Sequence, residues 1–282
     1  MNKIVLFGKN GQVGSELTNL FASWSLTALG KDDVNIVDRF AVERVFNEVR
    51  PEVVINAVAY NDVDGVEIYP DLAMQVNASA NGFLARLSAQ YNALYITYSS
   101  DFVFDGKTTL PYLETDAPHP INKYGESKLA GDLAVQNSGA SSIILRTSSV
   151  YSLTRPCFLT RIIQQSNKNA IPVRTDLVSC PTSAKFVAHA TAFIVKNYRS
   201  DLHSYAGLYN LCSSGFASRY QWAMEIQKLM GLNLNIIPID GDSGKSQAPR
   251  PTFCPLNNLL FQRTFDIQIP TWNDMLYALL ER

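Results

Sequence analysis

The chain lacks an excess of charge of either sign. Its 282 residues include 24 Lys and Arg against 25 Asp and Glu, and charged residues make up 17% of the total. Proteins that bind nucleic acid or an anionic membrane through their overall charge carry a cationic excess. We therefore expect neither nucleic acid nor a membrane as a partner, and a small soluble ligand instead.

Long apolar runs are absent as well. No stretch approaches the roughly 20 residues that span a bilayer. The opening MNKIVLFGKNG enters a predicted strand without the charged leader and cleavage site of a signal peptide. The sequence accordingly predicts a cytoplasmic protein. Hydrophobic residues still make up 46% of the chain, which is enough to bury a large core.

Cysteine and histidine are few and scattered. No two cysteines have CxxC spacing, and the histidines do not cluster near them, so we expect neither a disulfide framework nor a metal site. Buried or incidental thiols are the preferred interpretation. The residues concerned are Cys157, Cys180, Cys212, Cys254, His119, His189 and His203.

What the chain does contain is an alternation of short apolar runs with longer segments of helical period. Strands are predicted at 3–7, 26–29, 52–56, 94–98 and 142–146, and helices at 12–23, 38–49, 71–90 and 122–136. This alternation is typical of an α/β protein with a Rossmann-type, doubly wound parallel sheet covered on both faces.

After about residue 150 the alternation loosens. We expect residues 1–150 to form an NAD(P)-binding Rossmann domain that also receives part of 172–210. Residues 151–282 should then form mainly a smaller α/β substrate-binding cap. In such a sheet the ligands lie beyond the carboxyl ends of the strands.

A glycine-rich turn follows the first predicted strand. In GKNGQVG, Gly8, Gly11 and Gly14 are spaced three apart across a strand-to-helix junction. Glycines there let the backbone approach a pyrophosphate, and the free N–H groups of the helix N-terminus attract its charge. This context favours dinucleotide binding over a merely structural turn.

The end of the second strand reads ALGKDD, and it bears on which nicotinamide cofactor is used. Enzymes that prefer NAD usually place an acid there, whereas a 2′-phosphate requires a cation. Gly30 occupies the expected acidic position and Lys31 follows it. We therefore predict that NADPH is accepted at least as well as NADH. Asp32 or Asp33 can serve as the acid instead, and this alternative stays open.

A possible catalytic set follows from the stretch HPINKYGESKLAGD. Tyr124 and Lys128 are four residues apart on one helical face, and Ser100 ends the fourth strand. Tyr124 is predicted to donate a proton to a carbonyl oxygen that Ser100 holds, while the Lys128 ammonium and an oxidised nicotinamide favour the phenolate and Lys128 binds the ribose. The plainer alternatives are a strand-end cap, a packing tyrosine and a solvated lysine.

Several longer motifs carry a resemblance to a known family. They include FGKNGQVG, SSDFVFDG, YLETDAPHPINKYGESKLAGD and ILRTSSVY. With these the chain resembles the extended short-chain dehydrogenase/reductases, and within them the dTDP-4-dehydrorhamnose reductases, over nearly its whole length. The resemblance implies reduction of the 4-keto group of a nucleotide-linked 6-deoxy sugar by a nicotinamide cofactor.

The resemblance and the residue patterns together assign three groups of site residues, with no metal ligand among them. The expected catalytic residues are Ser100, Tyr124 and Lys128; the cofactor-binding residues are Gly8, Asn10, Gly11, Gln12, Val13, Gly14, Lys31, Asn35, Ile36, Ala57, Ala59, Tyr60, Asn61, Tyr98, Tyr124 and Lys128; the substrate-binding residues are Ser100, Asp101, Ser149 and Arg250. Arg250 is the expected clamp for a diphosphate, with a solvated surface arginine as the alternative.

The chain departs from the family pattern on the substrate side. Ser149 stands where the relatives carry Trp, Leu177 and Ser179 replace Gln and Gly, and Cys254 replaces Ser. These departures preserve the expected hydride transfer but leave the sugar open.

Two other functions stay open at this level. A nucleotide-sugar epimerase or dehydratase is one; against the dehydratase, Ser100 is followed by Asp101 and Phe102 rather than by an acid/base pair. The other is a non-catalytic NADP-binding regulatory subunit resembling that of methionine adenosyltransferase. A homodimer is a further expectation that the sequence does not decide.

Overall fold

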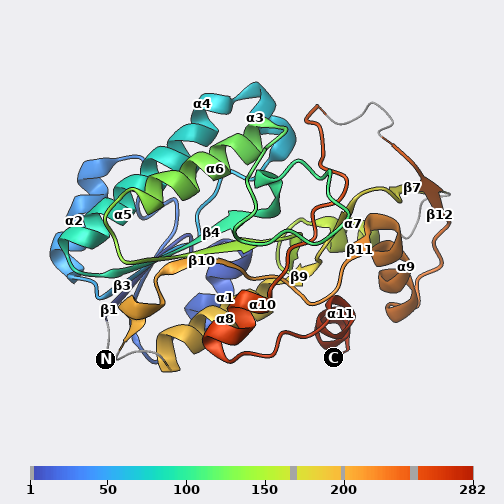
Figure 1. Ribbon diagram of the computed structural model, residues 1–282. Coiled ribbons are helices and arrows are strands. Elements are labelled where there is room, and N and C mark those ends of the chain that lie inside the picture. The colour runs from blue at the N-terminus through green and yellow to red at the C-terminus, as the bar shows by residue number, and fades with distance from the viewer. Residues whose placement is uncertain (1–2, 166–169, 198–200, 242–246, 282) are drawn as a thin grey trace.

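A six-stranded sheet forms the centre of this computed structural model, which describes residues 3–165, 170–197, 201–241 and 247–281 (Figure 1). The strand order is β10-β5-β4-β3-β1-β2, and every neighbouring pair is parallel. The expected doubly wound parallel fold is thereby confirmed. The strands are β1 (Lys3–Phe7), β2 (Ser25–Leu29), β3 (Val53–Asn56), β4 (Leu94–Ser100), β5 (Ser142–Thr147) and β10 (Gly207–Asn210).

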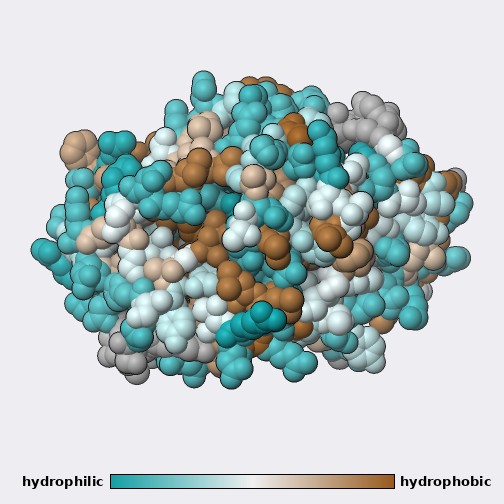
Figure 2. Space-filling model, viewed as in Figure 1, coloured by the Kyte–Doolittle hydropathy of each residue, from teal (hydrophilic) through white to brown (hydrophobic). Residues whose placement is uncertain are grey.

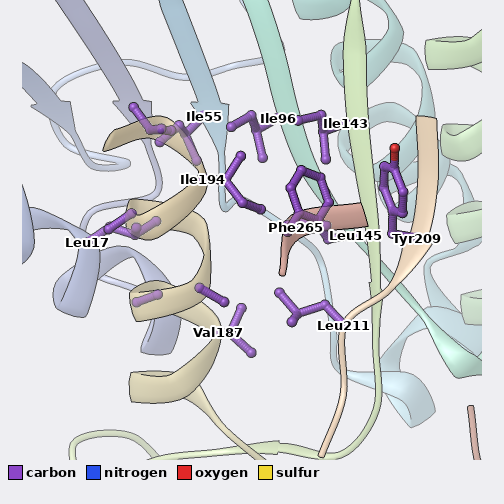
Figure 3. Close-up of a cluster of buried hydrophobic side chains, with 14 of the residues drawn as sticks. Leu17, Ile55, Ile96, Ile143, Leu145, Val187, Ile194, Tyr209, Leu211 and Phe265 are labelled. Atoms are coloured by element: carbon purple, nitrogen blue, oxygen red, sulfur yellow. The ribbon is translucent and has the colours of Figure 1, made fainter. Parts of the chain in front are cut away.

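Helices cover both faces of the sheet because successive strand residues point to opposite sides. In β1, Ile4 and Leu6 enter one apolar cluster, whereas Val5 and Phe7 enter the other. Figure 3 shows the first cluster, in which side chains of the sheet meet Val187 and other helix residues. One layer contains α1 (Gln12–Leu20), α8 (Ala184–Asn197) and α10 (Leu259–Phe265); the other contains α2 (Arg39–Val49), α5 (Asn81–Gln90) and α6 (Lys123–Gln136).

The helix predicted over 71–90 is not uniform. It consists of α4 (Pro70–Ala73), a π-helical segment η1 (Met74–Ala80) and α5. The widened segment packs against α6 at Gly131, where an added Cβ would lie 2.2 Å from the carbonyl oxygen of Asn77. A π-helical turn inside a helix frequently marks a functional site. Here it carries Asn77, a residue of the site described below.

Part of the chain beyond residue 150 returns to the sheet. Helix α8 packs on α1, and β10 pairs with β5 in parallel register. The assignment of cofactor binding to 1–150 and of substrate binding mainly to 151–282 stays a prediction.

The remaining elements form a smaller group at the carboxyl end of the sheet (Figure 1). They enclose an apolar cluster around Trp222. They are β6 (Val150–Tyr151), α7 (Phe158–Gln164), β7 (Ile171–Arg174), β8 (Val178–Ser179), β9 (Thr182–Ser183), β11 (Ala217–Ser218), α9 (Arg219–Leu229), β12 (Ile236–Ile239) and α11 (Trp272–Leu280); the short elements α3 (Val63–Ile68), η2 (Asp101–Val103) and η3 (Leu202–Tyr205) lie in connections.

Apolar residues are partly visible on the molecular surface. In the same view as the ribbon, Figure 2 shows them gathered across the middle of this face, with many hydrophilic residues around them. None of the helices in the described ranges combines the length and the apolar character that a bilayer span requires.

Candidate active site

The order of the strands locates the candidate site. From β1 the chain moves outward to β2 on one side and to β3 on the other, so the winding reverses between β1 and β3. Ligands of such sheets bind in the crevice beyond the carboxyl ends of the strands at this reversal. The predicted cofactor segments 8–14 and 57–61 directly follow β1 and β3.

The turn after β1 has no space for a side chain at two of its three glycines, Gly8 and Gly14. Gly8 has φ +93°, and a Cβ there would lie 2.8 Å from the carbonyl carbon of Ala57. A Cβ on Gly14 would lie 2.0 Å from the carbonyl oxygen of Gly8. Two strand ends and the start of α1 are therefore in close contact through the backbone.

The start of α1 is suited to an anion. Its N-cap, Gly11, has no side-chain cap, and its first turn holds no acidic residue. The side-chain oxygen of Gln12 is buried without a partner among the described residues. Open N–H groups at a helix N-terminus attract phosphate, so this turn fits the pyrophosphate of a dinucleotide.

An ion pair occupies the end of β2. Asp33 accepts a hydrogen bond from the Gly30 backbone N–H at 2.7 Å and from Lys9 Nζ at 2.6 Å. The hydrogen bond from Lys9 lowers the pKa of Asp33, and that from Gly30 acts in the same direction. Lys31 is exposed, and its side chain contacts none of the described residues through a hydrogen bond or ion pair.

Lys9 was missed by the sequence reasoning. Its position next to Gly8, in the turn that directly follows β1, the strand that pairs with β2, is the signal that could have revealed it. Of the two acids considered for this position, the structure places Asp33 at Gly30.

The loop after β3 is fixed by Asn77 of the π-helical segment. Asn77 accepts from the Tyr60 N–H at 2.8 Å and donates to the Tyr60 carbonyl at 3.0 Å. It also donates to Ser127 Oγ at 2.9 Å, and Ser127 donates to the Tyr124 carbonyl at 2.7 Å. Asn77 thus connects the predicted cofactor loop with the helix that carries Tyr124. The sequence reasoning missed it; an asparagine inside an apolar helix is the signal it left unused.

Two predicted cofactor residues have side chains engaged elsewhere. Ile36 is buried in the core beside Val42, so at most its backbone is available to a ligand. The hydroxyl of Tyr98 bonds to Thr191 on α8 at 2.9 Å, while its carbonyl accepts from Lys128 at 2.8 Å. The predicted Asn10, Asn35, Ala59 and Asn61 are exposed on the surface of this region.

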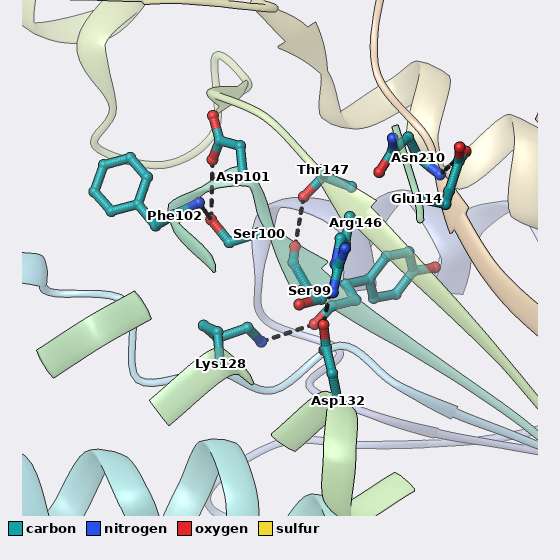
Figure 4. Close-up of polar contacts among 11 residues, drawn as sticks. Ser99, Ser100, Asp101, Phe102, Glu114, Lys128, Asp132, Arg146, Thr147 and Asn210 are labelled. Atoms are coloured by element: carbon teal, nitrogen blue, oxygen red, sulfur yellow. Dashed lines mark hydrogen bonds and ion pairs between the residues drawn. The ribbon is translucent and has the colours of Figure 1, made fainter. Parts of the chain in front are cut away.

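The three predicted catalytic residues come together where β4 ends and α6 begins: Ser100 ends β4, and Tyr124 and Lys128 lie one turn apart near the start of α6. Figure 4 shows Ser100 and Lys128. A Cβ on Gly125 would lie 2.1 Å from the carbonyl oxygen of Phe102, so the start of α6 touches the segment that follows Ser100. The Phe102 ring also meets the Tyr124 ring edge-on, with centroids 5.6 Å apart. Tyr124 is half-buried, and Lys128 is buried one turn further along α6.

Of the two groups expected to favour the Tyr124 phenolate, Lys128 does not lower the pKa of Tyr124 in this structure, and the effect of an oxidised nicotinamide stays a prediction. Burial raises the pKa of Tyr124 to about 12, the Asp101 and Asp132 carboxyls add to the increase, and a hydrogen bond with Ser100 opposes it. We expected Lys128 to favour the phenolate, but its ammonium donates to the Tyr98 carbonyl and is influenced by Asp132 instead. The phenol therefore keeps its proton at neutral pH, as a proton donor must.

Asp101 lies next to Ser100 with both carboxyl oxygens occupied. Ser100 Oγ donates to Oδ1 at 3.0 Å, and Ser148 Oγ donates to Oδ2 at 2.6 Å. Burial raises the pKa of Asp101 to about 6, and these two hydrogen bonds together with Arg219 limit the increase. The site thus contains a carboxyl that titrates close to neutral pH.

A buried ion pair lies beneath Lys128. Asp132, a further turn along α6, accepts from Arg146 Nε at 3.1 Å, and both side chains are less than 5% exposed (Figure 4). Arg146 also lies over the Phe104 ring at 5.2 Å. Burial nevertheless raises the pKa of Asp132. The repeat of four residues from Tyr124 to Lys128 continues to Asp132, and the sequence reasoning stopped one turn short.

The predicted substrate residues are divided between two places. Ser149 follows β5 and bonds to Ser179 Oγ at 2.7 Å. Arg250 instead pairs with Asp64 on α3 at 2.9 Å, and no hydrogen bond among the described residues joins it to Ser149. The described ranges contain no group of three or more histidine, cysteine or acidic side chains suited to a metal ion.

Comparisons with known proteins agree over the full length of the chain. The family model described as RmlD substrate binding domain matches residues 1–282. The dTDP-4-dehydrorhamnose reductase of Escherichia coli K12 is 34% identical, covering 95% of this chain and 94% of the relative. The spore coat polysaccharide biosynthesis protein SpsK of Bacillus subtilis is 30% identical, covering 100% and 98%.

Solved structures extend the agreement. A dTDP-4-dehydrorhamnose reductase of Bacillus anthracis in complex with NADP superposes with a TM-score of 0.91 at 26% identity, covering 99% of this chain and 98% of the other. A UDP-glucose 4-epimerase of Thermus thermophilus in complex with NAD superposes at 0.80 with 19% identity over 99% and 97%. This second likeness shows the fold alone.

Proposed function

The chain belongs to the RmlD substrate binding domain family, and from this premise we propose that it is an NADPH-dependent reductase that converts dTDP-4-dehydrorhamnose to dTDP-L-rhamnose. NADH is expected to serve as well. The observation that carries the proposal is that Ser100, Tyr124 and Lys128 lie together at the end of β4 and the start of α6, in the same parallel sheet whose first strand is followed by the glycine turn. The product would feed the biosynthesis of cell-surface polysaccharide.

Each of the three side chains has a distinct role in the proposed reaction. When bound, NADPH supplies the hydride for the carbonyl carbon. Tyr124 donates its phenolic proton to the carbonyl oxygen, which its raised pKa permits because the group is protonated at neutral pH. Lys128 has two ammonium hydrogens beyond its bond to the Tyr98 carbonyl, and these can hold ribose hydroxyls.

Ser100 has to release Asp101 before it can hold the substrate. Its single hydroxyl hydrogen is donated to Asp101 Oδ1 in this structure. A protonated Asp101 can instead donate to Ser100, which frees the Ser100 hydrogen for the carbonyl oxygen. The carboxyl with a pKa near 6 is therefore suited to control the orientation of this hydroxyl.

The proposal is tested with the purified protein, NADPH and enzymatically generated dTDP-4-dehydrorhamnose, by following loss of NADPH absorbance and identifying the sugar product. Tyr124→Phe should reduce kcat by a factor on the order of 10² or more. Its NADPH Kd should change by less than about twofold, since the ring is retained.

Two results would contradict the proposal. Tight NADPH binding by the wild type without turnover of the sugar would favour the regulatory-subunit alternative. Full activity of Tyr124→Phe would remove the assigned proton donor. Loss of NADPH binding together with activity in the variant would indicate damage to the fold rather than to the chemistry, and a melting curve of each protein identifies that case.

A further inference from the structure

Arg219 is held in a fixed position on the cap side of the site. It is the first residue of α9, and its backbone N–H donates to the Leu177 carbonyl at 2.9 Å. Its guanidinium lies 4.8 Å from the centre of the Phe158 ring and 5.2 Å from that of Trp222. Aromatic faces stabilise a planar cation and restrict its orientation. The group is therefore preorganised rather than free in solvent.

This guanidinium has more donors than partners. It offers five N–H hydrogens, and its hydrogen bond to another side chain is the one to Ser149 Oγ at 3.2 Å. The ion pairs within the described part of the chain supply carboxylates to Arg146, Arg174 and Arg250 but not to Arg219. Asp101 attracts it through the electrostatic field, but among the described residues no carboxylate lies within ion-pair distance of the guanidinium. A half-buried cation with unused donors is a favourable place for an anion.

Ser149, the hydrogen-bond partner of Arg219, connects it to the predicted catalytic residue Ser100. Ser149 has φ +45°, a left-handed conformation that is uncommon for a residue other than glycine and that tends to persist at functional positions. The preceding residue, Ser148, donates to Asp101, which in turn accepts from Ser100. A short chain of contacts thus leads from the predicted catalytic hydroxyl to the guanidinium.

From this geometry we propose that Arg219, with the hydroxyls of Ser149 and Ser179, forms an oxyanion-binding subsite for the substrate. The group bound is an anionic oxygen. In the proposed 6-deoxy sugar nucleotide this is a diphosphate oxygen, and a carboxylate on the sugar would mean that the chain takes a different nucleotide-linked sugar. The inference rests on the proposed function, because it assumes a nucleotide-linked sugar in this cleft. Arg219 then determines substrate specificity without acting on the hydride transfer.

The test measures binding of dTDP and of thymidine to the NADP-loaded protein by titration calorimetry. Arg219→Met keeps an unbranched side chain between the two rings and removes the charge. It should weaken dTDP binding about tenfold or more, the size expected for one charge-assisted contact. The Kd values of thymidine and NADP should stay unchanged, and Arg219→Lys should fall between wild type and Met because it keeps the charge but not the fork.

A matched control comes from the neighbouring helix. Arg161 also stacks on Phe158, at 5.4 Å, but is exposed. Arg161→Met should change dTDP affinity less than about twofold, as solvent screens its charge. An equal loss of dTDP affinity in Arg219→Met and Arg161→Met would mean that dTDP responds to the overall positive charge of this region rather than to a subsite. That result would overturn the proposal.

The two sources of the anion are separated by comparing dTDP-glucuronate with dTDP-glucose as competitive inhibitors. If Arg219→Met binds dTDP and both nucleotide sugars more weakly than wild type does, the anion bound by Arg219 is the diphosphate. Loss of a wild-type preference for the glucuronate, with dTDP unaffected, identifies a sugar carboxylate. No change for any of these ligands refutes the inference. Reduction of the keto-sugar by wild type is measured in parallel, so a failed subsite is distinguishable from a failed function.

Discussion

The two sides of the candidate site are built in different ways. On the cofactor side, the shape comes from backbone: Gly8 and Gly14 leave no room for a Cβ, and the Ala57 carbonyl packs against the turn. On the substrate side, the shape comes from polar side chains, with Ser149, Ser179 and Arg219 joined by hydrogen bonds. A backbone-shaped site tolerates little change in sequence, whereas a side-chain-shaped site can be altered one residue at a time.

The largest effect on stability should follow from breaking the buried Asp132–Arg146 ion pair beneath Lys128. Asp132→Ala leaves the Arg146 guanidinium buried without a counterion, and we expect a loss of about 3–5 kcal/mol in the free energy of unfolding. The matched change on the substrate side is Asp64→Ala, which releases Arg250 where Asp64 is 43% exposed. Asp64 also accepts from the Gln247 and Ala248 N–H groups, so the loss should be about 1–2 kcal/mol, still below that at Asp132 because water reaches the exposed part of this site.

Both losses can be measured by urea denaturation at one pH. The contrast between the two sides would be broken if Asp64→Ala cost as much as Asp132→Ala. It would be sharpened if Asp64→Ala left stability unchanged and altered only the affinity for dTDP.

The second prediction concerns Asp101 and the pH dependence of the free energy of unfolding. The pKa of Asp101 is about 6 in the folded protein against 3.8 for an ordinary aspartate. Between these values the folded state binds a proton that the unfolded state does not, so stability falls as the pH rises through this window. Asp101→Asn removes this fall, and above pH 7 it should be more stable than wild type by up to about 3 kcal/mol.

The difference between wild type and Asp101→Asn should vanish near pH 4, which denaturation at pH 4, 6 and 8 would show. Asp71→Asn, at an exposed position of α4, is the matched control for the substitution itself. A stability difference that is constant from pH 4 to 8 in Asp101→Asn would contradict the raised pKa.

The smallest effect is expected in cofactor preference. Lys9→Met removes the cation at the end of β2 and should lower the preference for NADPH over NADH about tenfold, as one charge-assisted contact to a 2′-phosphate would. Lys31→Ala should lower it less, because Lys31 is exposed and its charge is screened.

Fluorescence titration of each variant with NADPH and with NADH gives the ratio of the two Kd values, which measures the cofactor preference. A larger fall in Lys31→Ala than in Lys9→Met would restore Lys31 as the main determinant. An unchanged ratio in both variants would remove the 2′-phosphate from this end of the crevice.

The sequence allowed prediction of the elements and contacts that depend on local spacing. Strand and helix periodicity gave the central sheet, and the glycine spacing of Gly8, Gly11 and Gly14 gave the turn. The π-helical segment around Asn77 was not predicted, because its geometry depends on the close approach of Gly131 from another helix. Arg219 was missed for a similar reason, because its contact with Ser149 forms only when α9 packs beside the segment that follows β5.

The position of β10 has a consequence for how the chain is made. This strand pairs with β5, although residues 148–206 lie between them in the sequence. A chain that has been synthesised only through β5 therefore presents an apolar strand edge with nothing to pair with. Unpaired strand edges are prone to associate with other chains, and this edge stays unpaired until residues 207–210 have been synthesised. For the same reason, a fragment ending at residue 150 is a poor choice for isolating the six-stranded sheet, because it lacks β10.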